Sequence, residues 1–154
     1  MNTHANTCCA GPNWSVMELT GGTCDVNPFL NSYEPVTKIP VAHCCTVWTD
    51  SRDSTEYLLV GDQMLWFRTL LENSLINPNQ MRAYGLLVND NPFNTSHGFG
   101  VNSEQVFIPF DTMGTVVYFN SCIPTEWEKT HLLIFLVTGK TWNPIRKLTS
   151  GMAK

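Results

Sequence analysis

The spacing of apolar residues constrains the fold of this 154-residue chain more than any other feature. The apolar residues come in short bursts, and turn-forming residues separate one burst from the next. Bursts of this kind fit β-strands, because a helix of ordinary length would need apolar positions that recur every three or four residues over several turns. The pattern therefore predicts a mainly β fold with few, short helices.

Polar turns between apolar bursts predict a β-hairpin in the first half of the chain. One turn is Asp50-Ser51-Arg52-Asp53-Ser54-Thr55, and Gly61-Asp62 is expected to form the next. The strands predicted around these turns are Val36 to Val41, Cys44 to Thr49, Glu56 to Val60 and Gln63 to Phe67.

Local signals predict one short helix before a clear boundary. The helix follows Pro78 and ends at Gly85, because Gly readily adopts the left-handed conformation of a helix stop. Residues 89–98 are loop formers throughout and mark the best boundary in the chain. We therefore expect two parts, residues 1–89 and residues 98–148.

The second part is predicted to be a small β-rich extension that packs on the first. Its hairpin is expected to consist of residues 105–110 and 115–120 around a turn at 111–114. A capping box from Thr125 to Glu128 predicts a second short helix. A strand over residues 132–138 is expected to follow it.

Composition excludes several classes of protein. Charged residues make up only 14% of the chain against roughly a quarter in an average domain, and hydrophobic residues make up 43%, so the chain is globular rather than disordered. The net charge of −4 offers no global attraction to nucleic acid, although five of the nine basic residues follow Glu128. The longest apolar run, residues 132–137, is too short to span a bilayer, and no leader is recognised. We expect an intracellular, cytoplasmic protein that binds neither nucleic acid nor membrane.

The cysteines are expected to be reduced thiols. Two adjacent pairs occur, Cys8-Cys9 and Cys44-Cys45, and without a secretory signal a disulfide framework is not favoured. His43 beside the second pair suggests zinc, but neighbouring side chains on a strand point to opposite faces and seldom converge on one ion. We therefore predict no metal and no cofactor, with one thiol of that pair facing the core and the other facing outward.

The first residues carry a resemblance to a known family. The run Asn2-Thr3-His4-Ala5-Asn6-Thr7-Cys8 resembles the Asp-(Ser/Thr)-Gly-Ala loop of retropepsins, and most closely the protease-like segment of copia-type LTR retrotransposon polyproteins. A second segment is similar to the apolar doublet, short helix and returning strand of that family. It comprises Met64 to Phe67, Asn73 to Met81 and Gly85 to Val88. The resemblance covers residues 2–89.

This resemblance implies a closed, barrel-type β domain with one short helix. In the family, two copies of the loop meet across a dimer axis, and two carboxylates about 3 Å apart share one proton for attack by water. The loop positions are Asn2, Thr3, His4 and Ala5. The substrate-covering flap and the supporting doublet would be supplied by Asp50, Ser51, Arg52, Asp53, Ser54, Leu75, Ile76 and Asn77.

The sequence departs from the family where the chemistry is done. Asn2 stands in place of the catalytic Asp, and an amide cannot take or hold the shared proton. His4 and Asn77 replace glycines of the family pattern, and the flap-like turn contains no Gly. The changes at Asn2 and Asn6 suit either a decayed element or a deliberate inactivation. A substitute acid at Asp62 is the weaker alternative, because a Gly-Asp pair between strands is usually only a turn.

Two functions from different classes follow from these observations. The first is a retrotransposon-derived aspartic endopeptidase-like domain, homodimeric in its intact form and inactive as written. The second is a non-catalytic module of the polyprotein that binds an extended peptide or a sister subunit by strand addition. The run at residues 2–7 could also be an ordinary polar arm, and a thiol hydrolase built on His4, His97 and a cysteine is disfavoured because no local pattern supports it.

Overall fold

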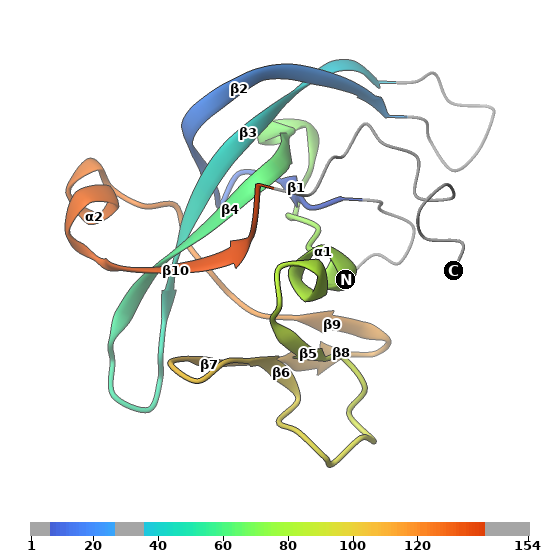
Figure 1. Ribbon diagram of the computed structural model, residues 1–154, viewed down its shortest axis with the longest axis vertical. Coiled ribbons are helices and arrows are strands. Elements are labelled where there is room, and N and C mark those ends of the chain that lie inside the picture. Colours follow the sequence, from blue (N-terminus) through green and yellow to red (C-terminus); the bar gives the residue numbers. More distant parts are fainter. Residues whose placement is uncertain (1–6, 27–35, 141–154) are drawn as a thin grey trace.

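The main sheet has five strands in a computed structural model that describes residues 7–26 and 36–140. Its strands are β1 (Cys9–Ala10), β2 (Ser15–Val26), β3 (Val36–Thr49), β4 (Glu56–Trp66) and β10 (Leu133–Thr138) (Figure 1). The predicted mainly β character is confirmed. The expected barrel closure is not found in the described residues, because β2 pairs only with β3 and the sheet stays open.

The β3–β4 hairpin is longer and more continuous than expected. Its turn at Asp50 to Thr55 is confirmed by hydrogen bonds from Asp50 N to Thr55 O and from Ser54 N to Asp50 O. The predicted second turn at Gly61-Asp62 is wrong, because both residues lie inside β4. A β-bulge replaces the turn: Ala42 pairs with Met64 and Cys44 with Gly61, so Asp62 and Gln63 stand opposite His43 alone.

One edge of β4 receives two strands that are far apart in sequence. β1 runs parallel to its C-terminal end, with Cys9 opposite Leu65. β10 runs parallel to its N-terminal half, with Leu133 opposite Tyr57. The predicted strand over residues 132–138 is therefore confirmed, and it completes the main sheet.

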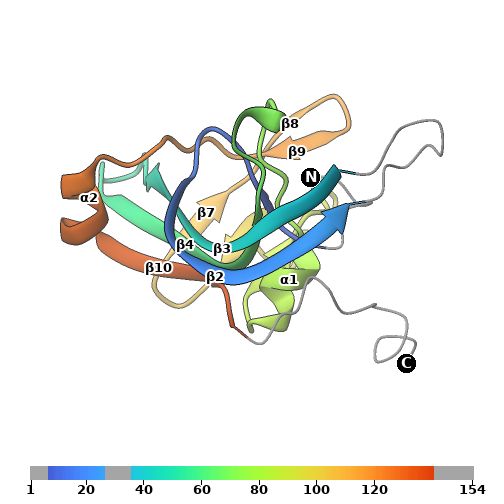
Figure 2. The same ribbon diagram turned by 90° about the horizontal axis from the view of Figure 1, so that it is seen from above.

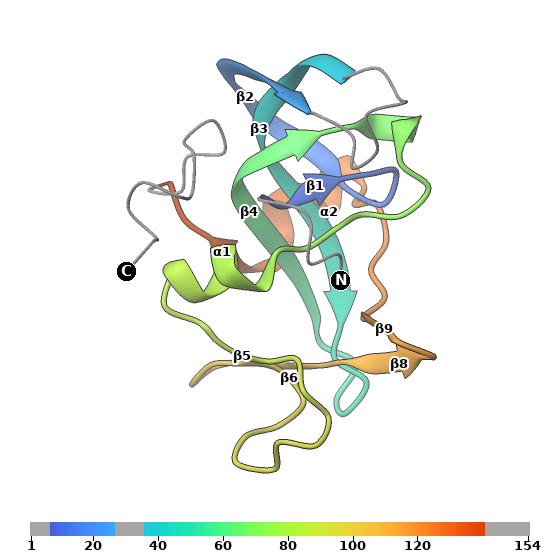
Figure 3. The same cartoon turned by 90° about the vertical axis from the view of Figure 1, so that its right-hand side faces the viewer.

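Two smaller sheets lie beside the main sheet (Figure 3). The first consists of β5 (Leu87–Asn89), β6 (Gly100–Asn102) and β7 (Phe107–Pro109), and the second is the hairpin of β8 (Asp111–Met113) and β9 (Val116–Tyr118). The predicted hairpin of residues 105–110 and 115–120 needs correction. Residues 107–109 pair with β6, and the hairpin turns at Gly114, which has a φ of 63°.

Both predicted helices are present and are capped by their own sequence signals. α1 (Pro78–Ala83) follows the N-cap Asn77 and ends before Gly85, whose φ of 104° is the expected left-handed stop. α2 (Glu126–His131) carries the predicted capping box between Thr125 and Glu128. A short 3-10 helix, η1 (Arg68–Leu70), follows β4. Figures 1 and 2 show α2 at the left end of the molecule and α1 nearer its middle.

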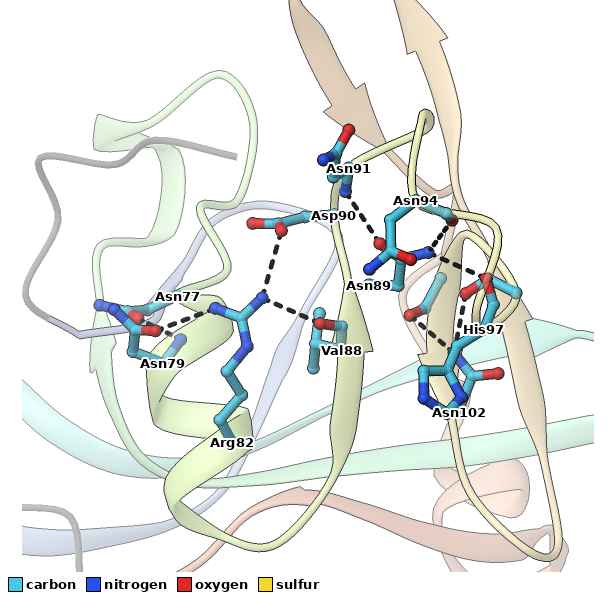
Figure 4. Close-up of polar contacts among 12 residues, drawn as sticks. Asn77, Asn79, Arg82, Val88, Asn89, Asp90, Asn91, Asn94, His97 and Asn102 are labelled. Carbon is cyan, nitrogen blue, oxygen red and sulfur yellow. Dashed lines mark hydrogen bonds and ion pairs between the residues drawn. The ribbon is translucent and has the colours of Figure 1, made fainter.

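The parts of the chain before and after residues 89–98 are joined by strand pairing and by packing. β5, before this segment, pairs with β6, after it. The largest core cluster contains Trp14 and Leu59 from the first part and Val101, Ile108 and Phe135 from the second. Asn89 holds the connecting loop by donating to the carbonyls of Asn94 and His97 at 3.0 and 2.9 Å (Figure 4). The residues before and after the loop therefore share one core.

Arg82 ties α1 to the strand that follows it. Its guanidinium donates to the Val88 carbonyl at 2.9 Å, contacts Asp90 at 3.2 Å and reaches Asn79 at 2.9 Å (Figure 4). Among the described helices, none is long and apolar enough to cross a membrane.

Candidate functional site

The residues expected to form the catalytic loop, Asn2, Thr3, His4 and Ala5, lie outside the described residues. The chain is described from Thr7 onward, so the structure defines the frame on which that loop would stand. This frame is the segment from Thr7 to Ala10, which is buried throughout.

The frame strand lies between two other segments. Leu65 N donates to Cys8 O at 2.9 Å on the side of β4. On the other side, Cys9 and Leu75 exchange two backbone hydrogen bonds of 2.7 and 2.9 Å. The expected packing of Leu75 and Ile76 behind a turn of residues 2–7 falls mostly outside the described residues; what is described is the pairing of Leu75 with Cys9.

A buried amide fixes the start of the frame strand. Gln80 of α1 is 0% exposed, and its Oε1 accepts from Cys8 N at 2.7 Å and from Thr7 Oγ1 at 2.9 Å. Its Nε2 donates to the carbonyls of Asp62 and Gln63 at 3.2 and 3.1 Å. One side chain thus connects the entry to β1, the bulge in β4 and helix α1.

Asn77 caps a helix. Its Oδ1 accepts from the backbone N–H groups of Asn79 and Gln80 at 2.8 and 3.2 Å, as an N-cap side chain does. It is 5% exposed, and its own N–H donates to Cys8 Sγ at 3.2 Å. The structure therefore gives Asn77 a clear part in holding α1 against the frame strand.

The flap-like residues Asp50, Ser51, Arg52, Asp53 and Ser54 lie at the end of β4 opposite to β1. Within this chain the structure does not bring them together with Leu75, Ile76 and Asn77. The turn stabilises itself, because Arg52 donates to both carboxylate oxygens of Asp50 at 3.0 and 2.7 Å. These hydrogen bonds hold the pKa of Asp50 below its usual value.

A cleft of about 860 Å3 opens beside the turn that follows β1. Its walls come from the turn after β1, the segment before α1 and the β8–β9 hairpin. They include the expected site residues Leu75 and Ile76. The remaining lining residues are Pro12, Asn13, Trp14, Glu72, Asn73, Ser74, Phe110, Met113, Val116, Val117, Tyr118, Phe119, Asn120 and Ser121.

Sequence reasoning did not find this cleft, because its walls meet only through long-range contacts. Asn13 is the clearest case: its Nδ2 donates to Ser121 Oγ at 2.8 Å, across 108 residues of sequence. No local motif marks either residue. The short apolar bursts at residues 110 and 116–119 were the only signal that pointed toward this region.

A second feature that the sequence left unresolved is the pair of His43 and Asp62. Nδ1 of His43 lies 2.6 Å from the buried Oδ1 of Asp62, which is ion-pair distance, and no other donor within the described residues reaches that oxygen. The bulge in β4 creates this contact, because it places Asp62 opposite His43. Asp62 is also one of the two β4 residues whose backbone carbonyls accept a hydrogen bond from Gln80.

Four of the six cysteine thiols are buried and stay protonated at neutral pH. Burial raises the pKa of Cys8, Cys9 and Cys44 to about 12 and that of Cys45 to about 11. Cys44 and Cys45 face opposite sides of β3 as expected, yet both are 0% exposed, so the expectation of one outward-facing thiol is wrong. Cys45 packs with Val47, Leu58 and Val60 in a separate small cluster, against which Leu132 lies.

Comparison of the chain with protein-family models, with curated proteins and with solved structures finds no match. The proposals below therefore rest on the sequence and on the geometry of the described residues.

Proposed function

We propose that this chain is a retropepsin-like domain of a retrotransposon polyprotein, related to an aspartic endopeptidase and without peptidase activity as written. The observation that supports the proposal is the frame strand, held by β4 on one side and by Leu75 on the other. The resemblance requires the apolar doublet beside the segment that carries the loop. Leu75 pairs with Cys9, two residues beyond the run at residues 2–7, and this pairing supports the proposal.

The loss of activity follows from the chemistry of residue 2. In an aspartic-protease site, water attacks the peptide bond while one carboxylate takes a proton from the water and the other, protonated, donates one to the carbonyl oxygen. The amide of Asn2 does neither. Two copies of the loop are needed, so the intact form acts as a homodimer that cleaves a polyprotein segment.

Restoring the acid tests this function. Asn2→Asp, made in a chain extended at its N-terminus, should cleave peptide substrates at acidic pH in its dimeric fraction, whereas the unmodified chain should not. Asn91→Asp is the matched control, because it adds the same carboxylate in an exposed loop. Cleavage by the unmodified chain that persists when Asn2 is changed would show that the site is elsewhere. A folded, dimeric Asn2→Asp protein without activity would count against the family assignment.

A second candidate function is favoured by one observation, the cleft beside the β8–β9 hairpin. A non-catalytic module of a polyprotein would bind an extended peptide or a sister subunit there by adding a strand. The two functions are compatible, because binding a peptide in the cleft requires no carboxylate at residue 2.

A further inference from the structure

The loop between β5 and β6 exposes an aromatic side chain that the fold does not use. Phe93 is 90% exposed, the highest value among the exposed large hydrophobic residues that the structure describes. Its ring makes no aromatic pair within the described residues. A single exposed apolar residue needs no explanation by itself. The backbone around Phe93 distinguishes it from the others, because that backbone is held in one shape.

The tip of the loop is a closed turn around Pro92. Asn94 N donates to Asn91 O at 3.1 Å, which is the hydrogen bond of a β-turn. Phe93 N donates to Asn91 Oδ1 at 3.0 Å, so the side chain of Asn91 satisfies a second backbone group. Pro92 occupies the second position of the turn, where its fixed φ is favoured. Residues 91–94 therefore present the Phe93 side chain on a backbone that is already ordered.

Asn89 fixes the base of this turn (Figure 4). It is 6% exposed, and its Nδ2 donates to the carbonyls of Asn94 and His97 at 3.0 and 2.9 Å. Its Oδ1 accepts from Asn91 N at 3.1 Å. The loop therefore needs little further ordering when a partner binds, and an interface segment that is ordered in advance loses less conformational entropy on binding.

The tip carries no charged side chain. Residues 91–99 contain no Asp, Glu, Lys or Arg. Asp90, just before them, contacts Arg82 at 3.2 Å. Loops that bind anionic membranes or nucleic acid carry clusters of Lys and Arg, which this loop lacks. A protein partner with an apolar pocket is the better fit, because an aromatic residue in a desolvated pocket is a common anchor of protein interfaces.

Asn91 adds a polar group beside this aromatic anchor. Its Oδ1 accepts from Phe93 N, and this hydrogen bond sets which end of the amide is the oxygen. Its Nδ2 makes no hydrogen bond within the part of the chain that the structure describes, and the residue is exposed. An acceptor on a partner can therefore bind this amide and distinguish Asn91 from other residues at the same position.

We propose that Asn91, Pro92 and Phe93 form a docking site for a protein domain that recognises an Asn-Pro-Phe turn. Such a domain has an apolar pocket for the phenyl ring and an acceptor for the amide of Asn91. The site goes beyond both proposed functions, because it requires neither residue 2 nor the cleft. Through it another protein would recruit this chain without covering the frame strand.

Direct binding to the unmodified 154-residue chain tests the proposal. The probe is a purified domain that binds linear Asn-Pro-Phe peptides through an apolar pocket, labelled with fluorescein and followed by fluorescence anisotropy. We expect saturable binding. Phe93→Ala should weaken it by about tenfold or more, because this change removes the anchor. Leu70→Ala, at an apolar residue that is 69% exposed on η1, is the matched control and should leave the affinity unchanged.

A second pair of variants tests the amide of Asn91. Asn91→Asp keeps an oxygen for Phe93 N but removes the Nδ2 donor, so binding should weaken by about fivefold. Asn94→Asp adds the same charge in the same turn and keeps the oxygen to which Ser96 N donates, so it should weaken binding less. A linear peptide of residues 88–98 should bind about tenfold more weakly than the chain, because it must order the turn on binding.

Four results would overturn the proposal. One is the absence of saturable binding at millimolar domain, and another is equal weakening by Phe93→Ala and Leu70→Ala. The third is a chain that sediments as a dimer and becomes monomeric on Phe93→Ala, because a second copy would then hold the ring. The fourth is binding to vesicles of phosphatidylcholine and phosphatidylserine that Phe93→Ala abolishes, because the loop would then be a membrane contact. Circular dichroism checks that each variant is folded, and none of these results depends on the peptidase test.

Discussion

A buried amide side chain stabilises a fold only when its donors and its acceptor are all paired. Gln80 meets this condition with four partners: two on the frame strand at Thr7 and Cys8, and two carbonyls on the bulge of β4. Through these four hydrogen bonds one side chain of α1 holds the frame strand and the bulge of β4 together.

Replacing Gln80 should be costly. Gln80→Leu keeps a similar volume but removes the acceptor of the buried Cys8 N–H, and an unmet buried group costs about 1–3 kcal/mol. The two β4 carbonyls still accept from Thr138 and Thr7. We expect a loss of about 1–3 kcal/mol in the free energy of unfolding, measured with urea. Gln105→Leu makes the same change at an exposed site and should alter stability by less than about 0.5 kcal/mol. Equal effects of the two variants would contradict the role of Gln80.

The Asp50–Arg52 pair should give the hairpin turn a pH dependence. Arg52 lowers the pKa of Asp50 in the folded chain, so its contribution to stability is complete above about pH 4, the usual range of an aspartate, and is lost as the pH falls through the lower folded value. Arg52→Gln should therefore lower the melting temperature at pH 7, and the difference from the unmodified chain should disappear near pH 2. Arg68→Gln, at an exposed arginine without an ion pair in the described chain, is the control. A difference that stays constant with pH would contradict this origin.

At the scale of elements, features with local causes were predictable from sequence. The capping box at Thr125 and Glu128, the helix stop at Gly85 and the turn at residues 50–55 each depend on residues within one or two turns of chain. The structure contains all three. These features could be predicted because each is stabilised by nearby residues and needs no contact with a distant segment.

Elements that depend on a distant partner were mispredicted or missed. Gly61-Asp62 has the composition of a turn, yet β3 and β10 pair with β4 on both edges there and keep the chain extended. Gly61 also makes room for the side chain of Met64, which a Cβ would strike. The cleft was missed for the same reason, since the contact of Asn13 with Ser121 leaves no trace in the neighbouring sequence.

For the whole molecule, the shared core predicts that the second half does not fold alone. Residues 98–154 would keep β6, β7 and the β8–β9 hairpin but lose β5 and β4, the partners of β6 and β10. Small sheets without a partner are marginal in water. The fragment should therefore show no cooperative thermal unfolding by circular dichroism, whereas the full chain should unfold in one transition. A soluble, cooperatively unfolding fragment would show that residues 89–98 separate two independent domains.

β1 and β10 pair with the same edge of β4 but are far apart in sequence, so this edge is covered in two steps as the chain is synthesised. Thr138 Oγ1 donates to the Asp62 carbonyl at 2.8 Å across 76 residues of sequence, so this edge of the sheet is closed only after residue 138 has been synthesised. Contacts of such separation slow folding, because a long loop must close before they form. On the ribosome, the nascent chain therefore presents an open apolar strand edge until residue 138 has emerged, and that interval is when chaperones would bind it and when it would aggregate without them.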